Sequence, residues 1–269
     1  MCQFFSGVIT KNKTLYDLDS DNHEDLIKKA RLKDDTRNPD FVRVELSPKD
    51  GDIFNHNMNN WGIRVDQDYK PEWFSGEFAE KEMKEALKRV IDERFIINDK
   101  SWQKRRGQRI FVKNSFVVAQ RNSFVEAWGN SSVEAWDNSS VVARENSSVE
   151  AWDNSFVVAW DNLSVMARKN SFVVAQRNSF VEAWGNSSVV AWGNSSVEAW
   201  GNSSVVAREN SSVEAWGNSS VVIPYSKNIE IKSINDSASV KDLSGASTDT
   251  PIIYVANKNI KLKQLKATK

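Results

Sequence analysis

Small residues recur at every second position along more than a third of the chain. Residues 114–225 consist of fourteen gapless copies of an eight-residue unit that reads Asn-Ser-Ser/Phe-Val-Glu/Val-Ala-Trp/Arg/Gln-x. Valine holds the fourth position in every copy, alanine the sixth in all but the last, and serine the second in all but one. A spacing of two is the period of a β-strand, whose alternate side chains share a face. The pattern therefore predicts one short strand per octad.

The variable positions of the octad indicate which side of each strand faces solvent. The seventh position accepts Trp128, Arg144 and Gln176, and the fifth accepts Glu150 and Val158. A close-packed interior site would not accept a full charge in one copy and an indole in the next. We therefore predict that Ser, Val and Ala fill a narrow interior and that positions three, five and seven face outward.

A short period without gaps is typical of a solenoid. An α-helix is excluded because 3.6 does not divide eight evenly and because the Asn-Ser-Ser cluster would interrupt it every two turns. Asparagine at the first position tolerates the left-handed backbone of a sharp corner, and stacked asparagines can hydrogen-bond along the axis. The fifth position is mostly valine in even octads and mostly glutamate in odd ones, which favours two octads, or sixteen residues, per coil over three. Recent duplication is a rival cause, since segment 114–132 recurs unchanged at 170–188.

The flanking segments lack the repeat. Residues 1–100 are expected to form a small α+β domain, with its helices on one face of a sheet. Residues 101–113 are predicted to be a basic connector, and 226–269 to be degenerate terminal coils with a cap that covers the open end of the solenoid. The predicted strands lie at 4–10, 41–46, 61–66 and 95–97, and the predicted helices at 23–32 and 75–93. The expected fold is thus an α+β N-terminal domain followed by an all-β solenoid (a β-helix).

Composition bounds the environment of the chain. It has 36 basic and 36 acidic residues, and the octads alone hold eleven acidic and six basic side chains. This imbalance is too small for a polybasic arm, so nucleic-acid binding is not predicted. The single cysteine excludes an internal disulfide. No N-terminal signal and no apolar run of 18 residues is visible, which predicts a cytoplasmic protein with no membrane contact.

Candidate catalytic chemistry is sparse. No phosphate-binding loop, dinucleotide motif or serine-nucleophile motif occurs. Removal of Met1 would make Cys2 an N-terminal nucleophile whose own amine could act as base, although a small apolar side chain at the start of a strand is the simpler interpretation. His23 and His56 are the only histidines, and no Cys/His cluster suggests zinc. The chain is therefore predicted not to be an enzyme and to hold no cofactor, metal or small-molecule substrate.

The outward seventh position carries the stronger candidates. Exposed aromatic patches often mark contact surfaces, Trp and Arg are enriched at binding hot spots, and Arg can stack on Trp between coils. Alternatively, ladders of like side chains stabilise the sheet without any partner. The candidate binding residues are Trp128, Trp136, Trp152, Trp160, Trp184, Trp192, Trp200, Trp216, Arg144, Arg168 and Arg208.

Octads such as N-S-S-V-E-A-W-G and N-S-S-V-V-A-R-E resemble those of octapeptide-repeat β-solenoid proteins from bacteria and their prophages. The resemblance covers residues 114–225, implies a β-solenoid and brings no catalytic residue with it. The leading hypothesis is a non-enzymatic scaffold or binding module that contacts a protein partner or a second copy of itself. One alternative is a phage counter-defence protein that mimics nucleic acid through a glutamate ladder. Another is a structural protein that assembles end to end.

Overall fold

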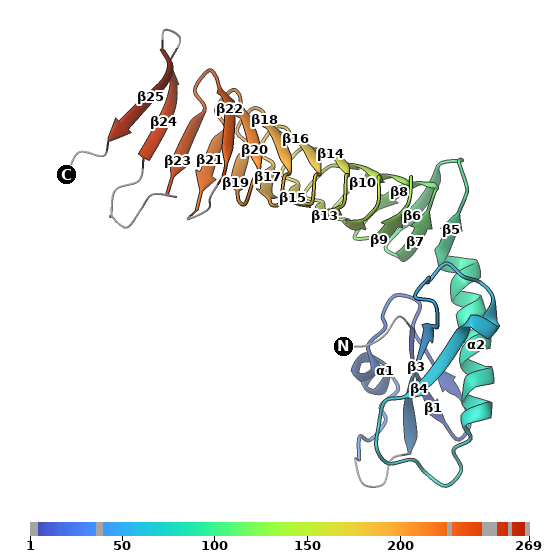
Figure 1. Cartoon of the computed structure of the whole chain (residues 1–269). Coiled ribbons are helices and arrows are strands. Elements are labelled where there is room, and N and C mark those ends of the chain that lie inside the picture. Colours follow the sequence, from blue (N-terminus) through green and yellow to red (C-terminus); the bar gives the residue numbers. More distant parts are fainter. Residues whose placement is uncertain (1–4, 36–39, 225–227, 244–251, 258–259, 267–269) are drawn as a thin grey trace. The chain divides into compact units, whose positions relative to one another are not determined.

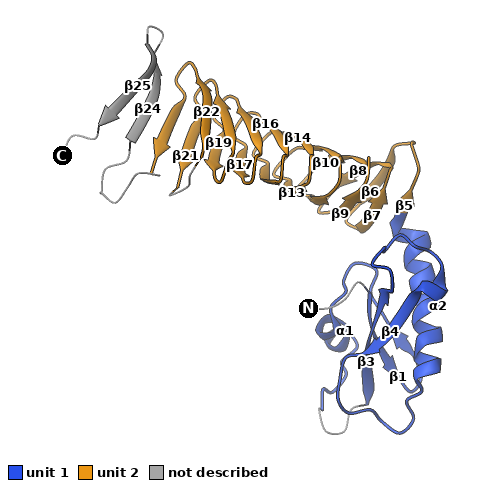
Figure 2. Ribbon diagram, in the orientation of Figure 1, with its two compact units in different colours: residues 1–95 blue, residues 96–269 orange. Residues whose placement is uncertain are grey.

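The computed structural model of the chain describes residues 5–35, 40–224 and 228–243, together with the backbone of 252–257 and 260–266. The chain divides into two compact units, residues 1–95 and 96–269 (Figure 2). Each unit has its own hydrophobic core. Cys2, the candidate nucleophile, lies outside the described residues.

The N-terminal unit is an antiparallel four-stranded sheet with two α-helices and a short 3₁₀-helix. The strand order is β2-β1-β3-β4. Side chains cap both α-helices, as Asn22 accepts a hydrogen bond from the backbone N–H of Glu24 and Ser75 accepts one from Phe78. The elements are β1 (Phe5–Thr10), β2 (Thr14–Leu15), α1 (His23–Lys29), β3 (Phe41–Pro48), η1 (Met58–Asn60), β4 (Trp61–Val65) and α2 (Gly76–Arg94).

The two helices cover opposite faces of this sheet (Figure 1). The expectation that both would share one face was wrong. Strand β3 is apolar on both sides: Val42 and Val44 pack with the apolar stripe of α2, whereas Phe41 packs with Leu26 and Ile27 of α1. Because successive residues of a strand point to opposite faces, this run of apolar residues requires a helix on each side.

Unit 96–269 contains a parallel β-solenoid of about nine turns with about 16 residues per turn, which confirms the prediction of two octads per coil. Odd octads form one sheet and even octads the other (Figure 1). The nine-stranded sheet contains β6 (Gln103–Arg106), β8 (Phe116–Gln120), β10 (Ser132–Ala135), β12 (Ser148–Ala151), β14 (Ser164–Ala167), β16 (Phe180–Ala183), β18 (Ser196–Ala199), β20 (Ser212–Ala215) and β22 (Glu230–Ile234). The twelve-stranded sheet contains β5 (Phe95–Ile97), β7 (Arg109–Lys113), β9 (Phe124–Trp128), β11 (Ser140–Ala143), β13 (Phe156–Trp160), β15 (Phe172–Gln176), β17 (Ser188–Ala191), β19 (Ser204–Ala207), β21 (Ser220–Ile223), β23 (Ser239–Asp242), β24 (Ile252–Asn257) and β25 (Ile260–Lys266).

Strands of neighbouring coils pair in register, so each octad position forms a column along the solenoid axis. Val133, for example, lies beside Val149, and Ala135 lies beside Ala151. The second, fourth and sixth positions of the octads are buried from end to end, and the third, fifth and seventh are partly or fully exposed except at the buried Val118. The predicted inward set is confirmed. The sequence of an octad does not determine which of the two sheets it joins. Segment 114–132 begins in the nine-stranded sheet, and its identical copy at 170–188 begins in the twelve-stranded sheet.

The buried serines have a role that the sequence did not reveal. Each octad serine except Ser115, which binds the Lys113 carbonyl, donates its hydroxyl proton to a backbone carbonyl three residues earlier, at the corner that the chain has just turned. Ser131 binds the carbonyl of Trp128 and Ser139 that of Trp136, both at 2.6 Å. The bond gives the corner carbonyl a hydroxyl donor in the dry interior, where an unsatisfied carbonyl would be costly. This bond explains why serine is nearly constant at the second position.

We expect Ser203→Ala to lower the free energy of unfolding by about 1–3 kcal/mol, since it removes the hydroxyl donor to the corner carbonyl of Trp200. The Ser203 hydroxyl lies 2.7 Å from the carbonyl oxygen of Trp200 and 3.0 Å from that of Ala183. The matched control is Ser204→Ala, on the exposed side of the same corner, which should change stability by less than about 0.5 kcal/mol. Guanidinium denaturation followed by circular dichroism measures both; equal effects would contradict this role.

Most corners use left-handed backbone at two successive residues, whereas those at Gly129, Gly185, Gly201 and Gly217 use it at the glycine alone. Asp137 and Asn138, the eighth and first positions of adjoining octads, have φ of 53° and 60°. Asparagine tolerates this conformation better than most residues, and glycine adopts it freely. Asparagine ladders also form, as Asn202 donates to Asn186 at 3.3 Å and Asn218 to Asn202 at 3.2 Å. Corner geometry and ladder together account for the constant first position.

The ends of the solenoid differ from the expected organisation. Residues 103–113 are not a connector: β6 and β7 pair in parallel with β8 and β9, and Ile110 and Val112 lie in the interior. Their basic residues are at least partly exposed, and Arg105 pairs with Ala119 in an inward column, which hid the strand pattern among charges. At the other end β22 and β23 extend the two sheets, but β24 and β25 pair antiparallel, so the parallel coils stop at β23.

Candidate functional site

The solenoid presents two flat surfaces of different character. We call the outward side of β9 to β21 in the twelve-stranded sheet the valine face. Its central column is the fifth octad position, which begins with Glu126 and then holds only valine. All six valines are partly exposed. They are Val142, Val158, Val174, Val190, Val206 and Val222.

Aromatic and cationic side chains flank the valine column on both sides. The exposed rings of Phe156 and Phe172 stack with centroids 5.5 Å apart and planes 5° from parallel. On the other side, the seventh position holds tryptophan in every second coil, with Arg144, Gln176 and Arg208 between the tryptophans. The guanidinium carbon of Arg144 lies 4.8 Å from the ring centroid of Trp128, and that of Arg208 lies 4.6 Å from Trp192. This confirms the predicted cation–π stacking of Arg on Trp between coils.

We call the outward side of β8 to β20 in the nine-stranded sheet the glutamate face. Its fifth position begins with the buried Val118 and then holds Glu134, Glu150, Met166, Glu182, Glu198 and Glu214. Two indole N–H groups on this face approach carboxylates of the same strand: Trp136 lies 3.4 Å from Glu134, and Trp184 lies 3.3 Å from Glu182. The face is therefore charged along its centre, where the valine face is apolar.

Tryptophans on the glutamate face form stacked ladders. Trp136 and Trp152 stack with centroids 4.8 Å apart, and Trp200 stacks between Trp184 and Trp216 at 5.1 and 4.9 Å. Arg168 separates the two ladders, with its guanidinium 4.7 Å from the Trp152 ring and 3.5 Å from the Glu150 carboxylate. Because each ring is covered by its neighbour, a partner would meet indole edges rather than open aromatic planes.

The structure places every candidate binding residue on an outward column, as predicted, but divides them between the two faces. Binding itself stays a prediction. Sequence reasoning used the alternation of the fifth position only to count octads per coil. It proposed tryptophan and arginine as contact residues and did not propose the valine column as a contact surface. The valine face carries Trp128, Arg144, Trp160, Trp192 and Arg208, and the glutamate face carries Trp136, Trp152, Arg168, Trp184, Trp200 and Trp216.

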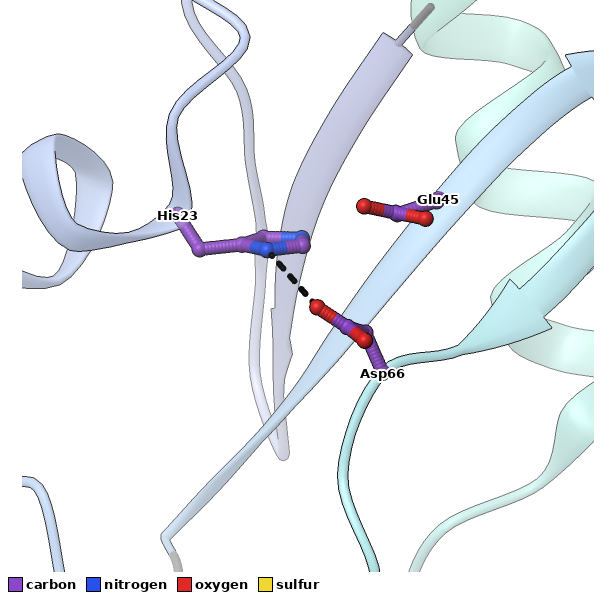
Figure 3. A group of neighbouring side chains, drawn as sticks. All are labelled: His23, Glu45 and Asp66. Atoms are coloured by element: carbon purple, nitrogen blue, oxygen red, sulfur yellow. Dashed lines mark ion pairs between the residues drawn. The ribbon is translucent and has the colours of Figure 1, made fainter. Parts of the chain in front are cut away.

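A second candidate lies in the N-terminal unit, where His23, Glu45 and Asp66 converge (Figure 3). One imidazole nitrogen and one oxygen of each carboxylate all lie within 4.8 Å of one another. His23 and Glu45 are buried and Asp66 is exposed. No pattern in the sequence indicates this group, because its members are 22 and 21 residues apart and come from three different segments of the chain. The sheet register brings them together.

The other histidine has a different environment. Burial lowers the pKa of His56 below its ordinary value, while the nearby Asp92 and Asp52 carboxylates oppose that shift. Its ring packs edge-on against Phe95 with centroids 5.7 Å apart. Among the described residues, His56 belongs to no group of metal-ligating side chains.

Comparison with known proteins adds no assignment. No protein-family model matches the chain, and neither a curated protein nor a solved structure shows significant similarity to it. The structure shows the β-solenoid architecture, while membership of the octapeptide-repeat family stays a prediction. Within the described part of the chain, every helix is too short or too polar to traverse a lipid bilayer.

Proposed function

We propose that the solenoid is a non-enzymatic scaffold whose valine face docks a flat, apolar protein surface. The observation that carries this proposal is the uninterrupted, partly exposed column of six valines with stacked phenylalanines and Trp–Arg pairs beside it. Exposed apolar patches of this kind mark contact surfaces in proteins. Parallel sheets are normally covered on both faces, and the outward face of this one carries no further layer among the described residues.

The size of the valine face fits a contact surface. Seven strands spaced about 4.8 Å apart, each about five residues wide at 3.3 Å per residue, give roughly 500 Å². That area is in the upper part of the range for the largest apolar patch on a monomer, about 300–600 Å². The glutamate face has the same dimensions, but its carboxylate column would lose hydration under an apolar partner.

The first partner we expect is a second copy of this chain. Two flat sheet faces pack about 10 Å apart when their side chains interdigitate, and a symmetric pair needs only one self-complementary surface. Such a pair would bury roughly 1,000 Å² in total, which is near the lower limit for a specific interface. The expected dimer is therefore reversible and depends on concentration.

Sedimentation equilibrium of the full chain tests the proposal, with Val174→Lys placing a charge at the centre of the valine face. The matched control is Met166→Lys, which adds the same charge at the fifth position of the glutamate face. We expect the wild type and Met166→Lys to dimerise alike, and Val174→Lys to dissociate at least about tenfold more readily. A wild type that stays monomeric, and whose cross-linked partners in its native host do not depend on Val174, would refute it.

The glutamate column favours one other candidate. Glu182, Glu198 and Glu214 lie in register, one carboxylate per coil, and so form a regular line of negative charge. A nucleic-acid mimic would bind a DNA-binding protein through this line, with strong salt dependence. Met166 interrupts the column, so it presents only five carboxylates in two groups. Loss of such binding in Glu198→Gln, but not in Val174→Lys, would support this second function.

A further inference from the structure

We propose that His23, Glu45 and Asp66 bind a divalent transition-metal cation in the N-terminal unit. The proposal is independent of the valine face, because all three residues lie within residues 1–95. Each comes from a different element, and main-chain contacts fix each in place. His23 opens α1 directly after the Asn22 cap, Glu45 is central in β3, and Asp66 follows β4 with its N–H bonded to the Arg43 carbonyl at 2.9 Å.

A backbone carbonyl sets the tautomer of His23. Its Nε2 lies 3.0 Å from the carbonyl oxygen of Val44, which can only accept, so Nε2 carries the proton and donates it. In the neutral imidazole, Nδ1 then keeps its lone pair. Nδ1 lies 3.6 Å from a carboxylate oxygen of Asp66, and Figure 3 shows this pair with Glu45 beside it. Orientation of a ligating imidazole by a hydrogen bond from its other nitrogen is the usual arrangement in metal sites.

Burial strengthens the assignment. His23 is 4% exposed and Glu45 is 3% exposed. Two of the three donor side chains are therefore shielded from bulk water, where their attraction to a cation is stronger. Asp66, whose side chain is 45% exposed, leaves the group open to solvent on one side. A cation entering there would receive one nitrogen and two oxygen donors that are already gathered.

An unsatisfied hydroxyl beside Glu45 is a separate observation that points to a missing ligand. Ser6 is directly opposite Glu45 in the β1–β3 ladder, so the two side chains lie on the same face of the sheet. The Ser6 hydroxyl is fully buried and has no hydrogen-bond partner among the described residues. Buried hydroxyls are nearly always satisfied in native proteins. A metal-bound water next to Glu45 would supply the partner.

The donor set indicates the class of metal. One imidazole and two carboxylates suit zinc, manganese, iron or cobalt better than calcium or magnesium, which favour oxygen ligands alone. Donor atoms around tetrahedral zinc lie about 2.0–2.2 Å from the metal and therefore roughly 3.3 Å from one another. The three donors lie within 4.8 Å of one another, so binding requires a contraction of the group, although His23 Nδ1 and the Asp66 carboxylate are already 3.6 Å apart. Three protein ligands leave a fourth position for water.

Titration of the tag-free, full-length chain with Zn²⁺ and with Co²⁺ after chelator treatment tests the site. We expect one equivalent to bind with a dissociation constant in the micromolar range or below, with a cobalt spectrum that lacks thiolate charge transfer, which excludes Cys2 as a ligand. Excess Zn²⁺ should raise the melting temperature of the N-terminal unit by several degrees, because the metal binds the folded state.

The deciding variant is Asp66→Asn, with Asp68→Asn as its matched control. Both side chains are exposed, so both variants should fold, as circular dichroism will verify. Asp66→Asn should weaken Zn²⁺ binding at least tenfold and remove the thermal shift, whereas Asp68→Asn should leave both unchanged. His23→Gln should abolish binding. Absence of saturable binding by the wild type, or equal affinities in the two aspartate variants, would overturn the proposal and leave the group as a histidine–carboxylate ion pair.

Discussion

Glutamate in place of Val165 is expected to lower the free energy of unfolding of the solenoid by more than about 4 kcal/mol. Val165 is 1% exposed, and the fourth position that it occupies is valine in all fourteen octads. The interior there contains only serine, valine and alanine side chains, apart from Leu163, and offers no cation or spare donor to a carboxylate. An unpaired charge in such an interior is among the most destabilising changes known, so the coil around β14 should open.

The adjacent substitution Met166→Glu is the matched control. It adds the same side chain one residue later, on the outward side of the same strand. The neighbours of Met166 in the column are Glu150 and Glu182, which shows that a carboxylate is accepted at this position. Its cost should stay below about 1 kcal/mol, because repulsion between exposed charges is screened. Denaturation monitored by circular dichroism measures both variants, and similar losses would mean that the inward and outward assignments are mistaken.

Removal of one octad and removal of one coil are expected to give opposite results. Deleting residues 178–193 removes β16 and β17 and leaves every later strand in its own sheet. Deleting residues 178–185 removes β16 alone, so every later strand moves to the opposite sheet. Val174 should then lie beside Val206 in the first variant and beside Glu198 in the second. Both variants keep the serine, valine and alanine interior, so both should fold.

Paired cysteines in a Cys2→Ser background report these neighbours. Adjacent strands place Cα atoms about 4.8 Å apart, within the range of a disulfide. Cysteines at positions 174 and 198 should cross-link only in the one-octad deletion, and cysteines at 174 and 206 only in the one-coil deletion. If the proposed dimer exists, the one-octad deletion should also weaken it at least about tenfold, because glutamates would interrupt the valine column. Cross-linking of both pairs in the same variant would contradict a sixteen-residue coil.

Most of the solenoid could be predicted from the octads, because each copy repeats the same local structure of one strand followed by one corner. Alternation of small residues defined the strands and the interior, and the constant asparagine marked the corners. The fifth position indicated two octads per coil, because stacking in register requires like side chains to recur every sixteen residues. The hydroxyl bonds of Ser131 and its equivalents were not foreseen, since serine alone does not reveal which carbonyl it meets.

Prediction failed where the pattern was short or where contacts join distant segments. The strands at 103–113 were taken for a connector, because only Ile110 and Val112 keep the inward alternation among many charges. The two-residue strand β2 is too short to leave a pattern. His23, Glu45 and Asp66 could not be linked either, since nothing in the spacing of single residues along a chain specifies which strands become neighbours.

The unchanged recurrence of segment 114–132 at 170–188, on opposite sides of the solenoid, has a consequence for folding. A growing stack of near-identical coils offers many alternative pairings of almost equal energy, each offset by a whole coil. Two stretches of unique sequence can remove this degeneracy. One is the coil formed by β6 and β7, and the other is the coil formed by β22 and β23, in which β22 pairs with β20 through a register shift. The coil of β6 and β7 emerges from the ribosome before any octad does. It offers strand edges with which β8 and β9 pair, and this pairing sets the register of the later coils.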